Sequence, residues 1–129
     1  MTSAVAMRFY DVYHDKNVDL LDTLLAPTYV GQVNGRDIAG IEAAKGFISA
    51  FLAAFPDVRY TVHDTIADGD KVVTRWTATA THAGVFAGVE PTGKQVTMLG
   101  ITIFQIDGEQ IGALWNIWDV FGLLQQLQA

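Results

Sequence analysis

Several residue types and patterns are missing from this chain, and each absence narrows the classes of protein to which it can belong. There is no cysteine among the 129 residues, which excludes disulfides, thiolate zinc sites and cysteine nucleophiles. The eight lysines and arginines form no cluster and the net charge is −6, so neither nucleic acid nor an anionic membrane surface is expected as a partner. No apolar run approaches the length of a membrane span and the N-terminus lacks a signal-peptide pattern, so we expect a cytoplasmic protein.

Metal ligands and a nucleotide-binding loop are also missing. The histidines His14, His63 and His82 lie far apart, and none belongs to a metal-binding spacing such as H-E-x-x-H. The segment GVEPTGKQ, residues 88–95, nearly matches a phosphate-binding loop, but Gln95 replaces the hydroxyl residue that holds magnesium. A strand rather than a helix is expected after it, so no helix N-terminus would face a phosphate. We therefore predict no metal site and no cofactor.

Hydrophobic residues make up 50% of the chain, enough for one domain over residues 1–129 with a single buried core. In the first part of the chain they recur at helical spacing. Helices are predicted over residues 3–13, 17–25 and 40–55. Pro27 and Pro56 are expected to end the last two helices, and His14 ends the first, where an imidazolium is favoured by the helix dipole. Residues 28–37 form a short extended piece with a turn at Asn34–Gly35.

From Val58 onward the apolar pattern changes to a period of two, with many β-branched and aromatic residues. Strands are predicted over residues 58–67, 71–82, 95–106 and 110–120. Asp68–Gly69 and Asp107–Gly108 are typical of tight hairpin turns, so the first two strands and the last two should each pair antiparallel. Helices followed by strands indicate an α+β domain, in which the helices cover one face of a curved sheet and leave a pocket between them.

Asp119 is a carboxylate in an apolar stretch, ALWNIWDVFGLLQQL, that contains no cationic residue. Burying such a carboxylate is costly unless it has a partner, a helix terminus or a function. One explanation is structural, because Asp119 precedes VFGLLQQL, a possible short helix, and aspartate is a favoured N-cap. The other is functional, since strand alternation places Trp115, Ile117 and Asp119 on one face, which leads into the pocket if that face lies under the helices. The spacing leaves both explanations open.

Several short motifs point together to one family. They are Phe55-Pro56-Asp57, Gly69-Asp70-Lys71-Val72, Thr81-His82-x-Gly84, Pro91-Thr92-Gly93-Lys94, and Trp115 to Asp119 followed by GLLQQL. Over nearly its whole length the chain resembles the SnoaL-like polyketide cyclases, also called the ester cyclase group, within the nuclear-transport-factor-2-like fold. This resemblance implies a cone-shaped, curved antiparallel sheet with three N-terminal helices packed over its concave face. It also implies a deep apolar pocket and cofactor-independent ring closure by intramolecular aldol condensation.

In these cyclases an aspartate on the last strand is the general acid/base, and the matching residue here is Asp119. An aldol closure needs a proton removed beside one carbonyl and a proton supplied to another, and a carboxyl group with a raised pKa can do either. Members often carry a histidine after the "YV" of the first strand, whereas this chain has Gln32, which cannot shuttle a proton. The Arg-x-Asp arrangement of related epoxide hydrolases is missing, since Trp76 and Thr77 follow Arg75.

Three hypotheses follow. The first is a cyclase, or a related lyase or isomerase, that acts on a hydrophobic carbonyl compound with Asp119 as acid/base and His82 as a supporting polar group. His82 precedes the loop at Gly84–Gly88, although a histidine satisfied by hydrogen bonds fits equally well. Its predicted substrate-binding residues are Tyr13, Gln32, Trp76, Phe86, Met98 and Trp115. The second is a non-catalytic binder of a small apolar ligand in the same pocket, and the third is a dimerisation module.

A homodimer is expected in each case. The family implies one, and the strands are apolar on both parities, as in QVTMLGITIF, where Met98 and Phe104 oppose Leu99 and Ile101. Helices can cover one face of such a sheet, and a second copy of the chain can cover the other.

Overall fold

A computed structural model describes residues 2–129. The elements in chain order are α1 (Thr2–His14), the 3-10 helix η1 (Val18–Leu20), α2 (Leu21–Leu24), β1 (Leu25–Val33), β2 (Arg36–Ala39), α3 (Ile41–Ala54), β3 (Arg59–Asp68), β4 (Lys71–Thr81), β5 (Gln95–Asp107), β6 (Gln110–Trp118) and α4 (Val120–Gln128). Helices come first and most of the strands follow, as the change of period at Val58 predicts.

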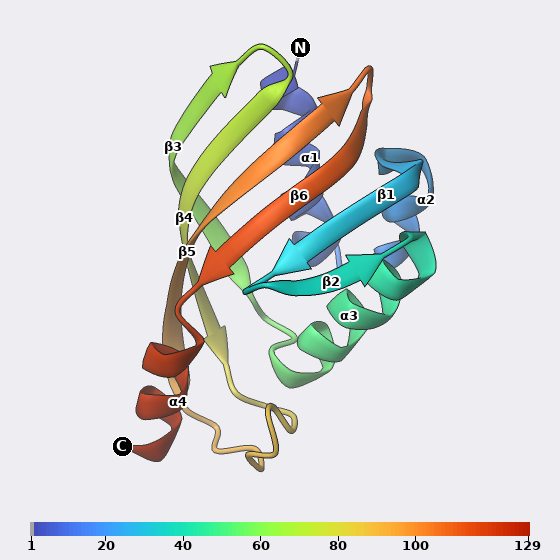
Figure 1. The fold of residues 1–129 in the computed structure, drawn as a ribbon. Helices are drawn as coiled ribbons and strands as arrows, with labels where there is room; N and C mark the ends of the chain where they lie inside the picture. Colours follow the sequence, from blue (N-terminus) through green and yellow to red (C-terminus); the bar gives the residue numbers. More distant parts are fainter. Residues whose placement is uncertain (1) are drawn as a thin grey trace.

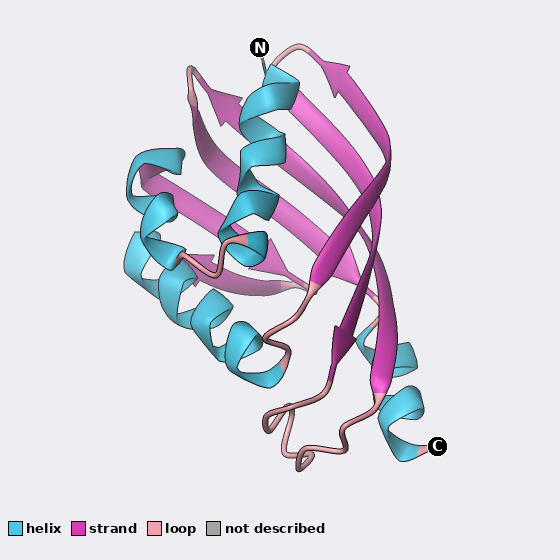
Figure 2. Ribbon diagram, turned by 180° about the vertical axis from the view of Figure 1, so that it is seen from behind, coloured by secondary structure: helices cyan, strands magenta, loops and turns pink. Residues whose placement is uncertain are grey.

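The six strands form one curled sheet that does not close, in the order β2-β1-β6-β5-β4-β3 (Figure 1). All neighbouring strands are antiparallel except β1 and β6, which run parallel. Helices α1, α2 and α3 cover the concave, inner face, while α4 lies at the lower end beyond β6 (Figure 2). The predicted α+β architecture, with three N-terminal helices over a curved and mainly antiparallel sheet, is confirmed.

Both predicted hairpins form where the sequence places them. Asp68 pairs with Lys71 and Asp107 with Gln110, which leaves two residues in each turn. The glycines at 69 and 108 have φ of 63° and 64°, a left-handed backbone that costs glycine little. The turn chemistry therefore sets the register of β3 with β4 and of β5 with β6.

Pro27 does not end the second helix, contrary to the prediction. Helix α2 ends at Leu24, and Pro27 lies inside β1. The register of β1 against β6 shifts between Leu25 and Val30, and Pro27 falls in this irregular part, where its missing N–H removes no regular ladder hydrogen bond.

Strand alternation separates the two faces of the sheet. On β4 and β5 the even-numbered residues from Val72 to Ala80 and from Val96 to Ile106 are buried against the helices. On β6 the inner residues are Leu114, Asn116 and Trp118, whereas Trp115 and Ile117 are exposed on the outer face. The prediction that the Trp115 face of β6 lies beneath the helices is therefore wrong.

Candidate functional site

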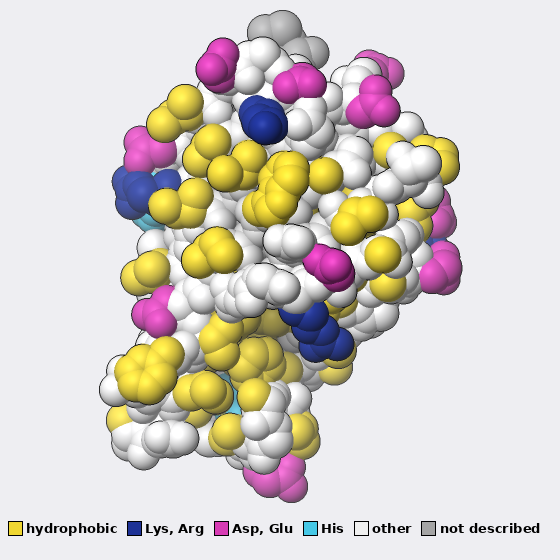
Figure 3. All heavy atoms as spheres, in the orientation of Figure 1, with side chains coloured by type: hydrophobic (Ala, Val, Ile, Leu, Met, Phe, Trp, Pro, Cys, Tyr) yellow, Lys and Arg dark blue, Asp and Glu magenta, His cyan; other side chains and the backbone are white. Residues whose placement is uncertain are grey.

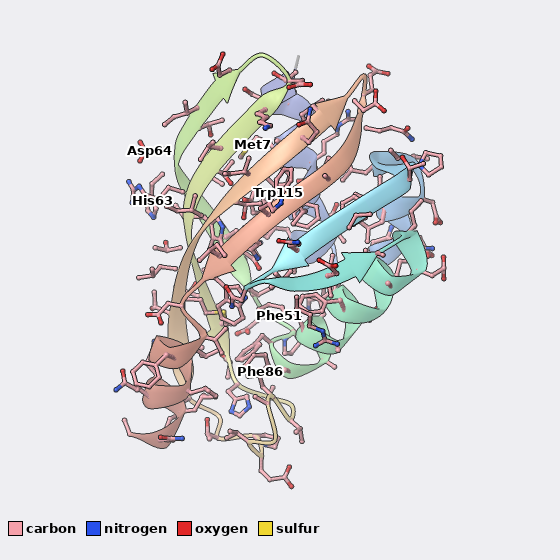
Figure 4. All side chains as sticks on the ribbon, viewed as in Figure 1. Met7, Phe51, His63, Asp64, Phe86 and Trp115 are labelled. Carbon is pink, nitrogen blue, oxygen red and sulfur yellow. The ribbon has the colours of Figure 1, made fainter. Side chains whose placement is uncertain are left out.

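An open pocket of about 690 Å³, which we call the mouth pocket, lies in the inner layer. It lies between α3, the end of β1, β2, the loop at 85–87 and the end of β6. Phe51, Phe86 and Trp118 form its aromatic wall, with ring centroids 6.2–6.4 Å apart. Figure 4 shows Phe51 on α3 and Phe86 on the loop together at the lower end of the sheet. Arg36 and Asp37 of β2 supply its polar rim.

Two smaller interior cavities lie deeper between α1, α3 and the sheet, with volumes of about 20 and 30 Å³. Phe47 lines both of them and the mouth pocket, and Phe51 and Trp118 line the mouth pocket and the smaller cavity. The mouth pocket and the interior cavities therefore adjoin at these rings. Each cavity exceeds the roughly 10–15 Å³ that one water molecule needs.

Tyrosines give the interior its ionisable groups. The rings of Tyr13 and Tyr60 are 4.9 Å apart, and those of Tyr10 and Tyr60 are 5.1 Å apart. Burial raises the pKa of Tyr10 to about 12, against the opposing effect of its hydrogen bond to Thr74. Burial also raises the pKa of Tyr13 and Tyr60 well above the usual value. At neutral pH these phenols keep their protons and can act as hydrogen-bond donors.

A chain of hydrogen bonds crosses the inner face of the sheet from β4 to β6. The Trp76 indole N–H donates to Thr102 Oγ1 over 3.0 Å, and the Thr102 hydroxyl donates to Asn116 Oδ1 over 3.2 Å. Trp76 lines the smaller interior cavity, Thr102 lines the larger and Asn116 lines both. The interior thus combines aromatic walls with a few placed polar groups, an arrangement typical of small-molecule sites.

A sequence profile of the SnoaL-like polyketide cyclase family matches residues 4–127. The chain belongs to this family. Its fold matches that of a candidate SnoaL-like polyketide cyclase from Jannaschia sp. CCS1, with a TM-score of 0.92 at 23% identity over 99% of this chain and 92% of that chain. A comparison with curated proteins finds no match.

Two other solved structures are closer in sequence. A candidate polyketide cyclase from Acidithiobacillus ferrooxidans is 32% identical, with a TM-score of 0.87 over 98% of this chain and 94% of that chain. IdmH, a candidate polyketide cyclase from Streptomyces antibioticus, is 28% identical, with a TM-score of 0.88 over 100% of this chain and 99% of that chain. The SnoaL-like assignment therefore rests on sequence as well as on fold.

Four of the predicted substrate-binding residues of this SnoaL-like chain lie at the pocket. Tyr13, Trp76 and Met98 line the smaller interior cavity, and Phe86 lines the mouth pocket. Their contact with a substrate stays a prediction.

Gln32 and Trp115 lie elsewhere, contrary to the prediction. They are Cα partners across β1 and β6 and share the outer face. Gln32 Nε2 donates to Asp37 Oδ1 over 2.9 Å, and Lys71 Nζ lies 5.8 Å from the Trp115 ring centre. Figure 4 shows Trp115 on the outer side of the sheet. The physical reason is that both parities of β6 are apolar, so alternation alone did not show which one the helices cover.

Asp119 occupies the N-cap of α4. Its Oδ1 accepts a hydrogen bond from Gly122 N–H over 2.8 Å, and its own N–H donates to the Leu99 carbonyl over 3.0 Å. The side chain is exposed and does not line the mouth pocket or the interior cavities. It lines instead a separate hollow of about 450 Å³ on the outer face of β4, β5 and β6. Its predicted place in the pocket beneath the helices is therefore wrong, and its side-chain hydrogen bond is that of a helix cap.

His82 is buried at the end of β4 and does not line the pocket either. Its Nδ1 accepts from Thr92 N–H over 3.2 Å, its ring packs 5.5 Å from Phe55, and its Nε2 has no partner in the described chain. The predicted place of His82 beside the substrate is not what the structure shows.

Sequence reasoning missed the residues that complete the site, namely Phe47, Phe51, Tyr60, Thr102, Asn116 and Trp118. The apolar face of α3 contained a signal for the two phenylalanines, and the even parity of β5 contained one for Thr102. To find Asn116 and Trp118 one had to know which face of β6 is buried, which the sequence left ambiguous.

No group of three or more histidine, aspartate or glutamate residues within 2–129 is placed to hold a metal. None of the helices in this range is long and apolar enough to cross a membrane.

Proposed function

We propose that this chain binds an apolar carbonyl compound in the mouth pocket and closes a ring in it by an intramolecular aldol-type reaction without a cofactor. Family membership supports the reaction class, because the relatives of 32% and 28% identity named above are both described as candidate polyketide cyclases. The observation that carries the proposal is the aromatic pocket of about 690 Å³ with neutral hydrogen-bonding groups behind it.

The reaction removes a proton from the carbon next to one carbonyl and forms a bond from that carbon to a second carbonyl carbon. The second carbonyl oxygen then takes up a proton, so the product is an isomer of the substrate. The pocket walls favour a folded apolar chain because they remove its hydrocarbon surface from water. Tyr13 lines the smaller interior cavity, and in this proposal its neutral phenol donates a hydrogen bond to an oxygen that enters the interior.

A role of Asp119 in this chemistry can be tested separately from its role as a cap. Asp119 lies between Trp118 and Val120, which both line the mouth pocket, but its Oδ1 accepts the hydrogen bond from Gly122 N–H that caps α4. The contacts in the structure support the capping role.

Replacing Asp119 distinguishes the two roles. Asp119→Asn keeps the shape and the capping acceptor but removes the titratable proton, whereas Asp119→Ala removes both. If Asp119 is the acid/base, the Asn variant melts as the wild type does but turns over roughly 10²- to 10⁴-fold more slowly. If it is only a cap, the Asn variant keeps full activity and the Ala variant loses about 1 kcal/mol of unfolding free energy.

A non-catalytic binder is the second candidate function. One observation favours it: within the described chain, no carboxylate, histidine or lysine lines the two interior cavities. Such a protein would hold the same apolar carbonyl compound without converting it.

Two measurements test the proposal. Native mass spectrometry of gently purified protein should show a bound small molecule. A linear diketone whose carbonyl groups are separated by three carbons should close to a conjugated cyclohexenone, after loss of water, faster with the protein than without it. Binding without turnover would support the binder, and the absence of both would contradict the proposed function.

A further inference from the structure

Asn116 is the polar residue that reaches both interior cavities from β6. Its side chain is on the inner face, between Leu114 and Trp118, and lines the cavities on either side. Its backbone carbonyl accepts a hydrogen bond from Asn34 N–H over 2.8 Å, and the Asn34 side chain in turn accepts from Trp118 N–H over 3.0 Å. These bonds fix the backbone that carries Asn116.

The orientation of the Asn116 amide follows from the direction of the hydrogen-bond chain. An indole N–H can only donate, so Trp76 makes the Thr102 oxygen an acceptor and leaves the Thr102 hydrogen for the next group. That hydrogen needs an acceptor, and Asn116 Oδ1 lies 3.2 Å away. The Trp76 and Thr102 side chains are buried, at 3% and 4% exposure, so water does not compete readily for these bonds. The amide oxygen of Asn116 therefore accepts the hydrogen bond from Thr102, and its Nδ2 group points away from Thr102.

The Nδ2 group is a donor without a protein acceptor. In residues 2–129 no oxygen or nitrogen accepts a hydrogen bond from it, and aromatic and aliphatic side chains supply most of the cavity walls around it. An amide donor in apolar surroundings is stabilised by any acceptor that reaches it. A carbonyl oxygen that reaches the cavity would satisfy it.

We propose that Asn116 Nδ2 donates a hydrogen bond to the carbonyl or enolate oxygen of the bound compound, and that Trp76 and Thr102 are positioning residues that hold the amide in this orientation. The inference rests on the proposed function and names the chemistry that its site recognises. The ligand class is a neutral ketone, aldehyde or ester rather than a carboxylate, because no lysine or arginine of the described chain lines the interior cavities to balance a charge.

Two probes of nearly equal shape test this assignment. Acetophenone carries a carbonyl oxygen, and α-methylstyrene carries a CH₂ group at the same position. Dissociation constants for both are measured by NMR titration. The wild type should bind acetophenone about tenfold more tightly, the value of one hydrogen bond in an apolar site.

Three variants locate the donor. Asn116→Leu keeps the size but removes the donor, so the two probes should bind with about equal dissociation constants. Thr102→Val removes the group that orients the amide, so it should reduce the preference for acetophenone several-fold. Thr74→Val is the matched control, because Thr74 lies on the same inner face but its hydroxyl bonds with Tyr10 over 2.7 Å. This variant should keep the wild-type preference. A preference that survives in Asn116→Leu would overturn the inference and point to another donor such as Tyr13.

The remaining outcomes distinguish a failure of this inference from a failure of the proposed pocket. If the wild type binds both probes equally, the inference fails while the proposed pocket stands, and if it binds neither, both fail. Should Asn116→Leu not fold, the side-chain amide resonance of Asn116 in the wild type gives the answer. Acetophenone should shift it and α-methylstyrene should not, and equal shifts with both probes would contradict the assignment.

Discussion

Gly100 on β5 lies where two tryptophan side chains of the inner layer pack against the strand. A Cβ atom at this position would lie 2.5 Å from Trp76 Cζ2 and 2.7 Å from Trp118 Cβ. Neither tryptophan can move aside easily. The Trp76 indole donates a hydrogen bond to Thr102, and the Trp118 backbone N–H donates one to the Asn34 side chain. The missing side chain at Gly100 thus lets both tryptophans take their places at the pocket.

Gly100→Ala should therefore destabilise the protein by about 1–3 kcal/mol, the cost of overpacking a filled core. Urea unfolding followed by tryptophan fluorescence measures the loss. Gly112→Ala is the matched control on β6, because its added Cβ would meet no atom closer than 3.7 Å, and its unfolding free energy should stay within about 0.5 kcal/mol of the wild type. Equal effects at both glycines would contradict this account of the packing.

His14 should make the folded state less stable at acidic pH, which is the opposite of what its position at the end of a helix suggests. At the end of α1 an imidazolium would be favoured by the helix dipole, but Nε2 accepts a hydrogen bond from Tyr60 N–H over 2.9 Å and so carries no proton. Partial burial, followed by the nearby Arg59 charge, lowers the pKa of His14 against the opposing effect of Asp11 and Asp15. The neutral form is the one that the fold prefers.

The unfolded chain therefore binds a proton at His14 at a higher pH than the folded chain does. The stabilisation from the neutral ring is fully present above the unfolded pKa of about 6.5 and is lost as the pH falls from there toward the folded pKa. His14→Gln keeps an acceptor for Tyr60 N–H but does not titrate. Its melting temperature should fall less than that of the wild type between pH 7.5 and 5.5. Identical slopes would exclude His14 as a source of acid sensitivity.

At the scale of elements, α4 completes the sheet where β6 ends. Strand β6 pairs with β5 only as far as Trp118 opposite Gly100, which leaves the earlier residues of β5 without a neighbour on that side. The Gln126 side chain fills this place: its Oε1 accepts from Thr97 N–H and its Nε2 donates to the Thr97 carbonyl, both over 2.8 Å. The amide of one side chain thus imitates a neighbouring strand.

Gln126→Ala should leave both Thr97 groups without these bonds and loosen α4. We expect a loss of about 1–3 kcal/mol for the two hydrogen bonds and faster amide hydrogen exchange over residues 120–128. Gln125→Ala is the control, because Gln125 is exposed and makes no side-chain hydrogen bond in the described chain. Unchanged exchange in the Gln126 variant would show that apolar packing alone holds the helix.

For the molecule as a whole, the outer face of the sheet is an apolar surface that no helix of the described chain covers. Leu99, Ile101 and Ile117 are 55%, 47% and 63% exposed there, beside Trp115 at 38%. Figure 3 shows hydrophobic side chains across this face, on the side of the sheet away from the helices. Contiguous apolar surface of this kind is typical of protein interfaces.

The homodimer predicted from the sequence should use this face. Ile101→Lys would place a charge in the middle of the interface and should convert the dimer to a monomer in sedimentation equilibrium at micromolar concentration. Val85→Lys is the control, because Val85 is 57% exposed but lies on the loop at the mouth pocket. A wild type that sediments as a monomer would contradict the prediction.

The sequence by itself determined the class of α1, α3 and the four strands β3 to β6. Helical spacing up to Phe55, alternation from Val58 and the two Asp-Gly turns are local signals, and local geometry decides between helix, strand and hairpin. The resemblance to the SnoaL-like family added the arrangement of helices over a curved sheet. Tyr13, Trp76 and Met98 line the smaller interior cavity and Phe86 the mouth pocket, and their contact with a substrate stays a prediction.

Only the tertiary structure decided which face of β6 the helices cover and where the chain returns to pair in parallel with β1. Both parities of β6 are apolar, because one is buried under helices and the other is exposed on the outer face, so hydrophobic alternation contained no choice between them. Asp119 and Trp115 were assigned to the inner face for this reason, and Asn116 was overlooked. Its hydrogen bond with Thr102 joins residues on different strands, and such a contact exists only once the strands have paired.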